Sequence, residues 1–395
     1  MRYSVKAIML ATGMLGLLAG GDALAQGRAG PPVSTPLPET DMPTLIRTLG
    51  IPESAQPVRE FLKTWHKPKK IVVFPDNNTN RMAWLREVVP ADVQLIEAKT
   101  PEEGMKLLKD ADAQLGNICN KPFVNATGPN FEWVQDNHTG VDSCFTGADV
   151  PAKIRPGGGV VVTNIQRVIS GAVGYHSFAL MVALSRGLEV YARNDPTGTF
   201  PPIDRGQLWS MQGRTLLVAG LGGIGSTHAR LAHALGMKVI ATNATIPATI
   251  PDYVDHVGLP GELLDLAPQA DVVASGLPLT PETTGIFNAA FFAKMKKGAM
   301  FINVTRGEQQ VEADLVAALQ SGQVGAVGLD DFNRRPDNPL LTLPHVLLTP
   351  HISAQAVDTD FNLGGQVTWD LARENLKRFV NGDKLLSVID PARGY

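Results

Sequence analysis

The sequence predicts an α/β protein with two doubly wound parallel-sheet domains, and three observations support that prediction. Short apolar strands alternate with helical segments from Lys70 onward. A glycine-rich turn at 220–225 joins another apolar strand to a helix and opens a second series of strands. A long helical stretch over 168–192 and a crossing loop over 194–208 separate the two series. Two such domains leave a cleft between them, which is where a ligand is expected to bind.

The first series of strands predicts a domain that the chain leaves and later re-enters. A helix near 364–380 and the tail LLSVID are expected to return to it, so this domain comprises residues 70–167 plus 355–395. One or two short helices are expected between Pro43 and Lys70. The predicted strands of this domain are 71–74, 93–98, 113–118, 131–135 and 160–164, with helices near 80–88 and 101–109.

The glycine-rich turn is the most specific motif of the chain. Gly220, Gly222 and Gly225 form a GxGxxG pattern between the strand 216–219 and a helix over 226–235. In a dinucleotide site the first glycine permits a tight turn, the second lets the backbone approach the pyrophosphate, and the third lets helix and strand pack closely. The helix N-terminus offers free N–H groups to the phosphates. A purely structural turn is the alternative, but the context favours a nucleotide-binding domain over residues 168–354.

Three polar side chains follow later strands of this second domain. Arg306, Asp330 and His351 stand at or just beyond strand ends, which face the ligand crevice in parallel α/β folds. An Arg can hold a carboxylate and polarise an adjacent carbonyl, and a His can exchange a proton near neutral pH. Taken singly, they are also compatible with a surface Arg and a structural His. Together with the glycine-rich turn they predict hydride transfer between a nicotinamide and a 2-oxo acid. The later strands are predicted at 272–276, 300–304, 325–330 and 346–351.

The first 25 residues have the layout of a secretory signal peptide. Arg2 and Lys6 precede an apolar stretch over 7–18, and Ala23-Leu24-Ala25 supplies a small-x-small cleavage site. We expect cleavage after Ala25, export to the periplasm, and a linker with an N-terminal extension over 26–69. The apolar stretch is short for a transmembrane span, so no stable membrane insertion is expected. An uncleaved membrane anchor is the alternative.

The composition is that of an ordinary globular chain. With a net charge of −3 and 18% charged residues there is no basic excess, so no nucleic-acid partner is expected. No metal site is predicted. Cys119 and Cys144 are the only cysteines. In an oxidising compartment they can form a disulfide, and two free buried thiols fit the count equally well.

The chain carries a series of short motifs: TGVD (139–142), YHSFAL (175–180), GLGGIG (220–225), LPLTPET (277–283), INVTRG (302–307), VGLD (327–330), LTPHIS (348–353) and RGY (393–395). Together these motifs resemble the D-isomer-specific 2-hydroxyacid dehydrogenases, the family of the glyoxylate/hydroxypyruvate reductases and phosphoglycerate dehydrogenase. The resemblance runs from about Lys70 to Tyr395. It implies NAD(P)H-dependent reduction of small 2-oxo acids by a homodimer, with a Rossmann-type nucleotide domain inserted in a split flavodoxin-like catalytic domain.

The resemblance also implies a role for each matching residue. Arg306 would bind the substrate carboxylate and carbonyl, and His351 would be the acid that protonates the nascent alkoxide. Asp330 would contact the nicotinamide carboxamide. The substrate carboxylate would meet backbone N–H groups of Thr139, Gly140 and Val141. The cofactor-binding residues implied by the motifs are Gly220, Gly222, Gly223, Ile224, Gly225, Leu277, Pro278, Val304 and Thr305.

One departure from the family pattern concerns the partner of the catalytic histidine. The family has a carboxylate five residues after the strand-end Asp, in a D-x-x-x-x-E-P run, whereas here the run is DDFNRRP and the position is Arg335. A nearby cation would lower the pKa of His351 and weaken it as an acid. Alternatively, Arg335 points outward and Asp331 or Asp337 serves as the partner. A third alternative is that Arg335 binds a second carboxylate or phosphate on an unusual substrate.

The second departure concerns the nucleotide. An NAD-selective site has an acidic residue at the end of its second strand to bind the ribose hydroxyls. Asn243 stands there, so no negative charge repels a 2′-phosphate, and no nearby Arg or Lys attracts one. The cofactor is therefore predicted as NAD(P), with a lean toward NADP.

Export and a nicotinamide cofactor are in tension, because free cofactor is scarce outside the cytoplasm. The leading hypothesis is an exported oxidoreductase acting on a small 2-oxo or 2-hydroxy acid. The rival hypothesis is an exported non-catalytic or weakly catalytic ligand- or nucleotide-binding protein on the same fold. A third possibility is a tightly bound cofactor that is recycled by internal redox exchange.

Overall fold

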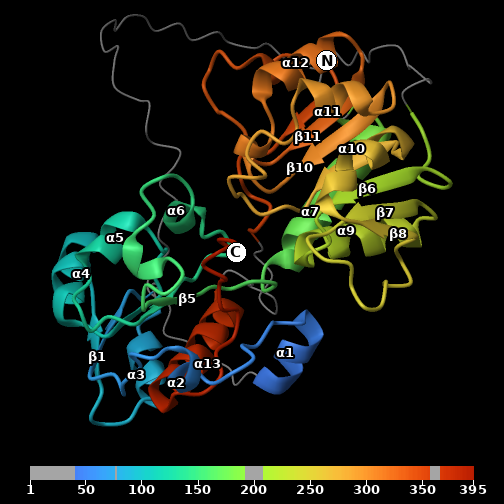
Figure 1. Ribbon diagram of the computed structural model, residues 1–395. Coiled ribbons are helices and arrows are strands. Elements are labelled where there is room, and N and C mark those ends of the chain that lie inside the picture. Colours follow the sequence, from blue (N-terminus) through green and yellow to red (C-terminus); the bar gives the residue numbers. More distant parts are fainter. Residues whose placement is uncertain (1–40, 76–77, 192–207, 356–364) are drawn as a thin grey trace, which may run out of the picture.

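The computed structural model describes residues 41–75, 78–191, 208–355 and 365–395. The chain forms two lobes, each built on its own parallel sheet, and the C-terminus lies between them (Figure 1). The predicted signal peptide and most of the predicted linker fall outside the described residues, as does nearly all of the predicted crossing loop. In the described parts of the chain, no helix is long and apolar enough to cross a membrane.

The first lobe contains a five-stranded parallel sheet in the order β2-β1-β3-β4-β5. This is the flavodoxin-like order, with its switch point between β1 and β3. The register pairs Ile71 with both Leu95 and Ala113. The strands are β1 (Lys70–Val73), β2 (Gln94–Glu97), β3 (Ala113–Leu115), β4 (Trp133–Gln135) and β5 (Val161–Thr163). All five lie where the sequence predicts them.

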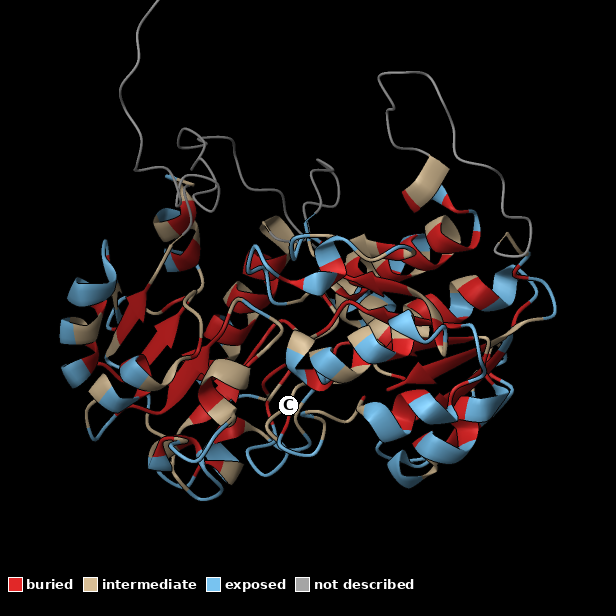
Figure 2. Ribbon diagram, turned by 90° about the horizontal axis from the view of Figure 1, so that it is seen from above, coloured by how far each residue is buried: buried red, intermediate tan, exposed pale blue. Residues whose placement is uncertain are grey.

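Short helices cover both faces of this sheet. The strands β1, β3, β4 and β5 are largely buried, the edge strand β2 is not, and the outer sides of the helices are exposed (Figure 2). The elements of this lobe are α3 (Arg81–Arg86), α4 (Pro101–Leu107), α5 (Lys121–Ala126) and α6 (Asp142–Phe145), with 3-10 turns at Leu108–Asp110 and Ala152–Ile154.

The C-terminal segment returns to this first sheet, as the sequence predicts. Helix α13 (Gln366–Asn381) stacks Phe379 on Trp133 with ring centroids 4.7 Å apart. The tail then forms an antiparallel bridge between Val388 and Thr163. The N-terminal extension supplies the two expected short helices, α1 (Met42–Leu49) and α2 (Val58–Phe61). The first lobe therefore includes both the N-terminal extension and the C-terminal segment, which bridge each other at Glu53 and Leu386.

The second lobe contains a seven-stranded parallel sheet in the order β12-β11-β10-β9-β6-β7-β8. The chain moves outward from β6 through β7 to β8 and then returns to the other side of β6, so the switch point lies between β6 and β9. Strand β8 was not predicted, because His256–Gly258 has no apolar run to mark it. The strands are β6 (Thr215–Ala219), β7 (Lys238–Thr242), β8 (His256–Gly258), β9 (Val272–Ser275), β10 (Ala299–Asn303), β11 (Val324–Leu329) and β12 (Val346–Leu348).

The helix predicted over 168–192 is two helices. α7 (Ser170–Ser185) ends before Gly187, whose φ of +63° is left-handed, and α8 (Leu188–Tyr191) follows. A Cβ at Gly187 would lie 2.9 Å from the Tyr191 ring, so the break needs a glycine. The remaining elements are α9 (Gly223–Ala234), α10 (Leu263–Leu266), α11 (Ala289–Lys294), α12 (Glu312–Gln320), and 3-10 turns at Pro260–Glu262, Ala267–Gln269, Gly307–Gln309 and Pro339–Leu341.

Cys119 and Cys144 are joined by a disulfide, which decides between the two alternatives left open by the sequence. Both cysteines are buried, and their Cα atoms lie 5.6 Å apart. The bridge connects the loop after β3 to α6, and the Ser143 hydroxyl adds a hydrogen bond to the Cys119 carbonyl. The segment just before α6 is TGVD (139–142), so the disulfide fixes the base of that loop.

Candidate functional site

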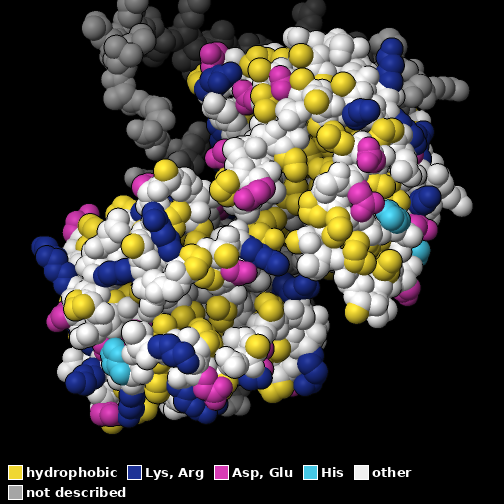
Figure 3. Space-filling view, in the orientation of Figure 1, with side chains coloured by type: hydrophobic (Ala, Val, Ile, Leu, Met, Phe, Trp, Pro, Cys, Tyr) yellow, Lys and Arg dark blue, Asp and Glu magenta, His cyan; other side chains and the backbone are white. Residues whose placement is uncertain are grey.

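A cleft of about 480 Å³ lies between the two lobes and takes its lining from both sheets. The two lobes meet there at a narrower waist (Figure 3). The loop after β4 forms one wall, and segments after β9, β10 and β12 form the other, together with the last two residues of the chain. Of the residues predicted from the sequence, those lining the cleft are Thr139, Gly140, Val141, Ile224, Leu277, Pro278, Val304, Thr305, Arg306 and His351.

The glycine-rich turn lies beside this cleft at the switch point of the second sheet, and its shape suits a pyrophosphate. Gly220 has a φ of +91°, and a Cβ at Gly225 would lie 2.1 Å from the Gly220 carbonyl oxygen. In contrast, a Cβ at Gly222 would meet no atom within 4 Å. Helix α9 begins at Gly223 without a side-chain cap, so its first N–H groups remain available to an anion. A nicotinamide dinucleotide therefore fits this part of the chain.

Asn243 follows β7 as predicted, next to the buried Thr242. Its amide Nδ2 donates a hydrogen bond to the Thr245 carbonyl at 2.9 Å. The position where an NAD-selective site carries an acid is thus a neutral amide anchored in its own loop. The geometry is compatible with either nucleotide.

Arg306 leans across the cleft onto the loop after β4. Its Nη2 and Nε lie 3.0 and 3.2 Å from Asp142 Oδ1, and Nη1 donates to the Thr305 carbonyl. A Cβ at Gly140 would lie 1.9 Å from Nη2, so a larger residue there would displace the guanidinium. Asp142 ends the TGVD motif, but no role was predicted for it from the sequence. The guanidinium is therefore held at the edge of the loop 139–141 by the Asp142 carboxylate.

His351 is paired with Asp331. The distance from His351 Nδ1 to Asp331 Oδ1 is 3.5 Å, and Asp331 Oδ2 accepts a hydrogen bond from the N–H of Gly307, the residue after Arg306. The hydrogen bond to Asp331 raises the pKa of His351 above its ordinary value. Burial alone would raise the pKa of Asp331, but its bonds to His351 and Gly307 outweigh burial and lower it. The pairing therefore favours an imidazolium beside a carboxylate.

Asp330 does not line the cleft. Its carboxylate is buried and accepts hydrogen bonds from the Thr349 hydroxyl at 2.6 Å and from the N–H groups of Ile352 and Ser353 at 2.9 Å. These bonds hold the turn at His351, whose φ of +58° is left-handed and costly for a residue with a side chain. Asp330 thus positions His351 in the structure. Its contact with the nicotinamide stays a prediction.

Arg335 points away from His351. Its Nη2 lies 3.2 Å from Glu312 Oε1, its Nε lies 3.1 Å from Asp337 Oδ1, and its side chain is 47% exposed. Of the alternatives raised by the sequence, the structure has the outward orientation, with Asp331 as the histidine partner. Asp337 is the partner of Arg335 instead. In this geometry Arg335 therefore does not lower the pKa of His351.

A second histidine in the cleft was missed by the sequence interpretation. His138 lies in the loop after β4 and lines the cleft. Its ring Nδ1 lies 2.9 Å from Oδ1 of Asp136, a carboxylate with no exposed surface. The available signal was three polar residues (136–138) directly after a strand, which is too common a pattern to single out.

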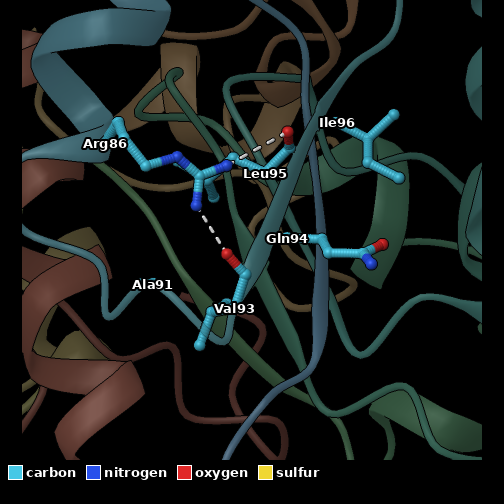
Figure 4. A pocket seen from close by; sticks show the side chains of 6 residues that line it. All are labelled: Arg86, Ala91, Val93, Gln94, Leu95 and Ile96. Carbon is cyan, nitrogen blue, oxygen red and sulfur yellow. Dashed lines mark hydrogen bonds between the residues drawn. The ribbon is translucent and has the colours of Figure 1, made fainter.

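Another hollow lies along the edge strand β2, and its lining residues differ in kind from those of the cleft. It is lined by Arg86, Ala91 and residues 93–96, and the Arg86 guanidinium is bonded to the carbonyls of Val93 and Leu95 (Figure 4). No acid, histidine or cysteine lines this hollow. The site chemistry is therefore in the cleft between the lobes.

Comparisons with known proteins agree with this geometry. A family model described as "D-isomer specific 2-hydroxyacid dehydrogenase, NAD binding domain" matches residues 178–353. The chain is 35% identical over 292 residues to a hydroxypyruvate reductase of Blautia hydrogenotrophica, covering 71% of this chain and 86% of that protein. It is 30% identical over 294 residues to a glycerate dehydrogenase of Methylorubrum extorquens, covering 72% and 87%.

A solved structure shows the same fold. It is a D-isomer specific 2-hydroxyacid dehydrogenase from Xanthobacter autotrophicus in complex with NADPH and MES, with a TM-score of 0.65 and 25% identity. The match covers 83% of this chain and all of that one. Sequence, sheet order and cleft agree, and the chain belongs to the D-isomer-specific 2-hydroxyacid dehydrogenase family.

Proposed function

We propose that this protein is an NAD(P)-dependent oxidoreductase that interconverts small 2-oxo acids and D-2-hydroxy acids, of the glyoxylate or hydroxypyruvate kind. The observation that carries the proposal is the convergence of Arg306 and the His351–Asp331 pair in one cleft beside the glycine-rich turn. The similarity to a hydroxypyruvate reductase and a glycerate dehydrogenase supports the same substrate class.

Substrate binding is assigned to the cleft wall after β4 and to Arg306. The guanidinium binds the substrate carboxylate and polarises the adjacent carbonyl with its forked N–H groups. Backbone N–H groups of the loop Thr139–Val141 bind the same carboxylate. Because Asp142 occupies the guanidinium in the structure, the substrate carboxylate must compete with it, which keeps Arg306 oriented before substrate arrives. We assign orientation, and not chemistry, to Asp142.

Proton transfer is assigned to His351. Bound NAD(P)H supplies a hydride to the carbonyl carbon, and the oxygen that becomes an alkoxide needs a proton. His351 donates that proton, while Asp331 stabilises the imidazolium and fixes the ring orientation. We propose that Asp331 replaces the carboxylate that the family carries at the position of Arg335. Gly307 links the two functions, because Asp331 binds its N–H directly after Arg306.

A direct assay tests this proposal. The purified protein is incubated with NADPH or NADH and with glyoxylate, hydroxypyruvate or pyruvate, and the loss of reduced-nicotinamide absorbance is recorded. Turnover above the rate without protein is expected. Absence of turnover with all three acids, together with measurable NAD(P)H binding, would favour the rival hypothesis of a binding protein on this fold.

The choice of nucleotide follows from the same assay. We propose use of both nucleotides with a preference for NADP, because the amide of Asn243 does not repel a 2′-phosphate. A kcat/KM for NADPH at least equal to that for NADH is expected. A strong preference for NADH would contradict this assignment.

Export and dimer formation are further parts of the proposal that rest on the sequence. Residues 2–25 have the charge and apolar pattern of a signal peptide, so the mature protein is proposed to begin at Gln26 in the periplasm. Mass spectrometry of the secreted form reads the N-terminus directly, and retention of residues 1–25 would contradict cleavage. The homodimer implied by family membership is tested by light scattering of the purified mature protein.

A further inference from the structure

His138 is a titratable group in the cleft that the proposed reaction does not use. It stands two residues before Gly140, in the loop that the substrate carboxylate is expected to meet, and its side chain is 56% exposed. The proton-donor role belongs to His351 on the opposite wall. An exposed histidine in a substrate-binding loop, held by a buried acid, therefore needs another explanation.

The histidine is held rigidly by Asp136. Asp136 Oδ1 accepts the backbone N–H of His138 at 2.7 Å and contacts its ring Nδ1 at 2.9 Å, and Oδ2 accepts the N–H of Cys119 at 2.7 Å. The disulfide to Cys144 anchors that same backbone. With Nδ1 bound to the acid, the other ring nitrogen, Nε2, has no partner among the described residues and is available to a ligand.

The contact with Asp136 favours the protonated, cationic form of His138. The hydrogen bond to Asp136 raises the pKa of His138, and the Arg306 guanidinium opposes that shift, so the two cations act on each other across the cleft. The acids Asp136 and Asp142 are already occupied by His138 and Arg306. An anion placed between the two cations would relieve their repulsion.

A neighbouring polar atom also lacks a partner. The Thr139 hydroxyl is out of contact with solvent and has no hydrogen-bond partner within the described part of the chain, although Thr139 lines the cleft. A buried hydroxyl without a partner is costly, and a ligand oxygen would remove that cost. It is a hydrogen-bond donor adjacent in sequence to His138.

We propose that His138, with the Thr139 hydroxyl, binds a second anionic group of the substrate, so that the physiological substrate is a 2-oxo acid with a carboxylate or phosphate at its other end. This inference rests on the proposed function, because Arg306 must hold the first carboxylate. It assigns to His138 the second-anion role that the sequence left open for Arg335, which the structure places at the surface.

Equilibrium binding tests the inference without turnover. The protein loaded with NADPH is titrated calorimetrically with D-malate, D-3-phosphoglycerate or D-lactate; acid and cofactor are both reduced, so no reaction follows. The three acids carry a second carboxylate, a phosphate and no second anion. We expect D-malate or D-3-phosphoglycerate to bind about tenfold or more tightly than D-lactate, as a charged hydrogen bond would give. The tighter of the two identifies the anion.

Variants at His138 locate the preference. His138→Gln should reduce the preference for the dianionic acid over D-lactate by about tenfold, and His138→Lys should restore part of it by returning a cation. D-lactate binding serves as the internal standard for folding. The matched control is His233→Gln, at an exposed histidine near the end of α9, which should leave the preference unchanged.

The outcomes separate this inference from the proposed function. Equal binding of all three acids, binding of none, or a preference that survives His138→Gln would overturn the inference. Reduction of glyoxylate by NADPH in the same preparation tests the function alone. If glyoxylate is reduced and no preference exists, only the inference fails. If no 2-oxo acid, oxaloacetate included, is reduced but His138 governs dianion binding, the reductase proposal fails and the anion site stands.

Discussion

Two histidine–aspartate pairs face the same cleft from opposite sheets, and they differ in what the acid binds besides the histidine. Asp331 follows β11, and its other oxygen accepts the N–H of Gly307, directly after Arg306. Asp136 follows β4, and its other oxygen accepts the N–H of Cys119, in the disulfide-anchored frame of the loop. Asp331 is thus connected to the segment that carries Arg306, and Asp136 to the disulfide-anchored backbone of the first lobe.

The two pairs also differ in how far the aspartate side chain is buried. The Asp331 side chain is 22% exposed, whereas that of Asp136 is fully buried. A partly exposed acid such as Asp331 remains solvated whether its histidine is protonated or neutral, so the imidazole can gain and lose its proton during turnover. A buried acid with three N–H donors favours the imidazolium form of its histidine, because loss of that charge would leave a buried carboxylate without its counterion. The comparison assigns proton transfer to His351 and anion binding to His138.

The largest loss of activity is expected from substitution of Arg306, which reaches from one wall of the cleft to Asp142 on the other. Arg306→Ala removes the group that holds the substrate carboxylate and leaves Asp142 without its counterion. We expect kcat/KM for glyoxylate to fall on the order of a thousandfold, because truncating one partner of a charged pair costs about 2–5 kcal/mol. Steady-state kinetics measures the loss. Arg306→Lys, which keeps the charge but loses the fork, should recover only part of it, and wild-type rates in Arg306→Ala would refute its assigned role.

The contribution of the backbone that anchors Asp136 is tested by removing the Cys119–Cys144 disulfide. The double variant Cys119→Ser, Cys144→Ser opens a loop of 25 residues, which is expected to lower the free energy of unfolding by about 3 kcal/mol. Urea unfolding of the oxidised protein measures the change. Dithiothreitol should destabilise the wild type and not the double variant. Free thiols in the wild-type protein, or an unchanged unfolding midpoint, would contradict this prediction.

The catalytic pair is tested through its pH dependence. Reduction needs protonated His351, so its rate is high below the His351 pKa and falls as pH rises through it. Asp331 raises that pKa, and Asp331→Asn should therefore move the falling limb to lower pH and reduce kcat at neutral pH by about tenfold to a hundredfold. The kcat–pH profile of glyoxylate reduction shows both effects. The oxidation of glycerate should have the opposite pH dependence; an unshifted limb in Asp331→Asn would assign the acid elsewhere.

The smallest effect is expected at Arg335. Its partners Glu312 and Asp337 form a surface network, and exposed ion pairs contribute about 0.5 kcal/mol or less. Arg335→Glu should leave kcat within about twofold of wild type and change the unfolding free energy by less than about 1 kcal/mol. Kinetics and urea unfolding on one preparation test both statements. A large gain in kcat would show that position 335 faces His351, contrary to the structure.

Much of the fold was predictable because its signals are local. Strands of apolar residues, the glycine pattern and the return of the C-terminal helix are all written in short stretches of sequence, and the structure confirms them. Several local predictions were wrong or missing, and two of them have a clear cause. The break at Gly187 was overlooked because an apolar stretch continued across it, and β8 was missed because three residues carry no periodicity.

The sequence by itself determined most of the strands and their order along the chain, the two parallel sheets, the glycine-rich turn, and the placing of Arg306 and His351 at strand ends, because these depend on residues close together in the chain. Only the tertiary structure decided the pairing of charges. Asp142 reaches Arg306 across 164 positions, Asp331 and not Arg335 faces His351, and His138 turns into the cleft. Side-chain direction and distance between two lobes set these pairs, and no local pattern encodes either.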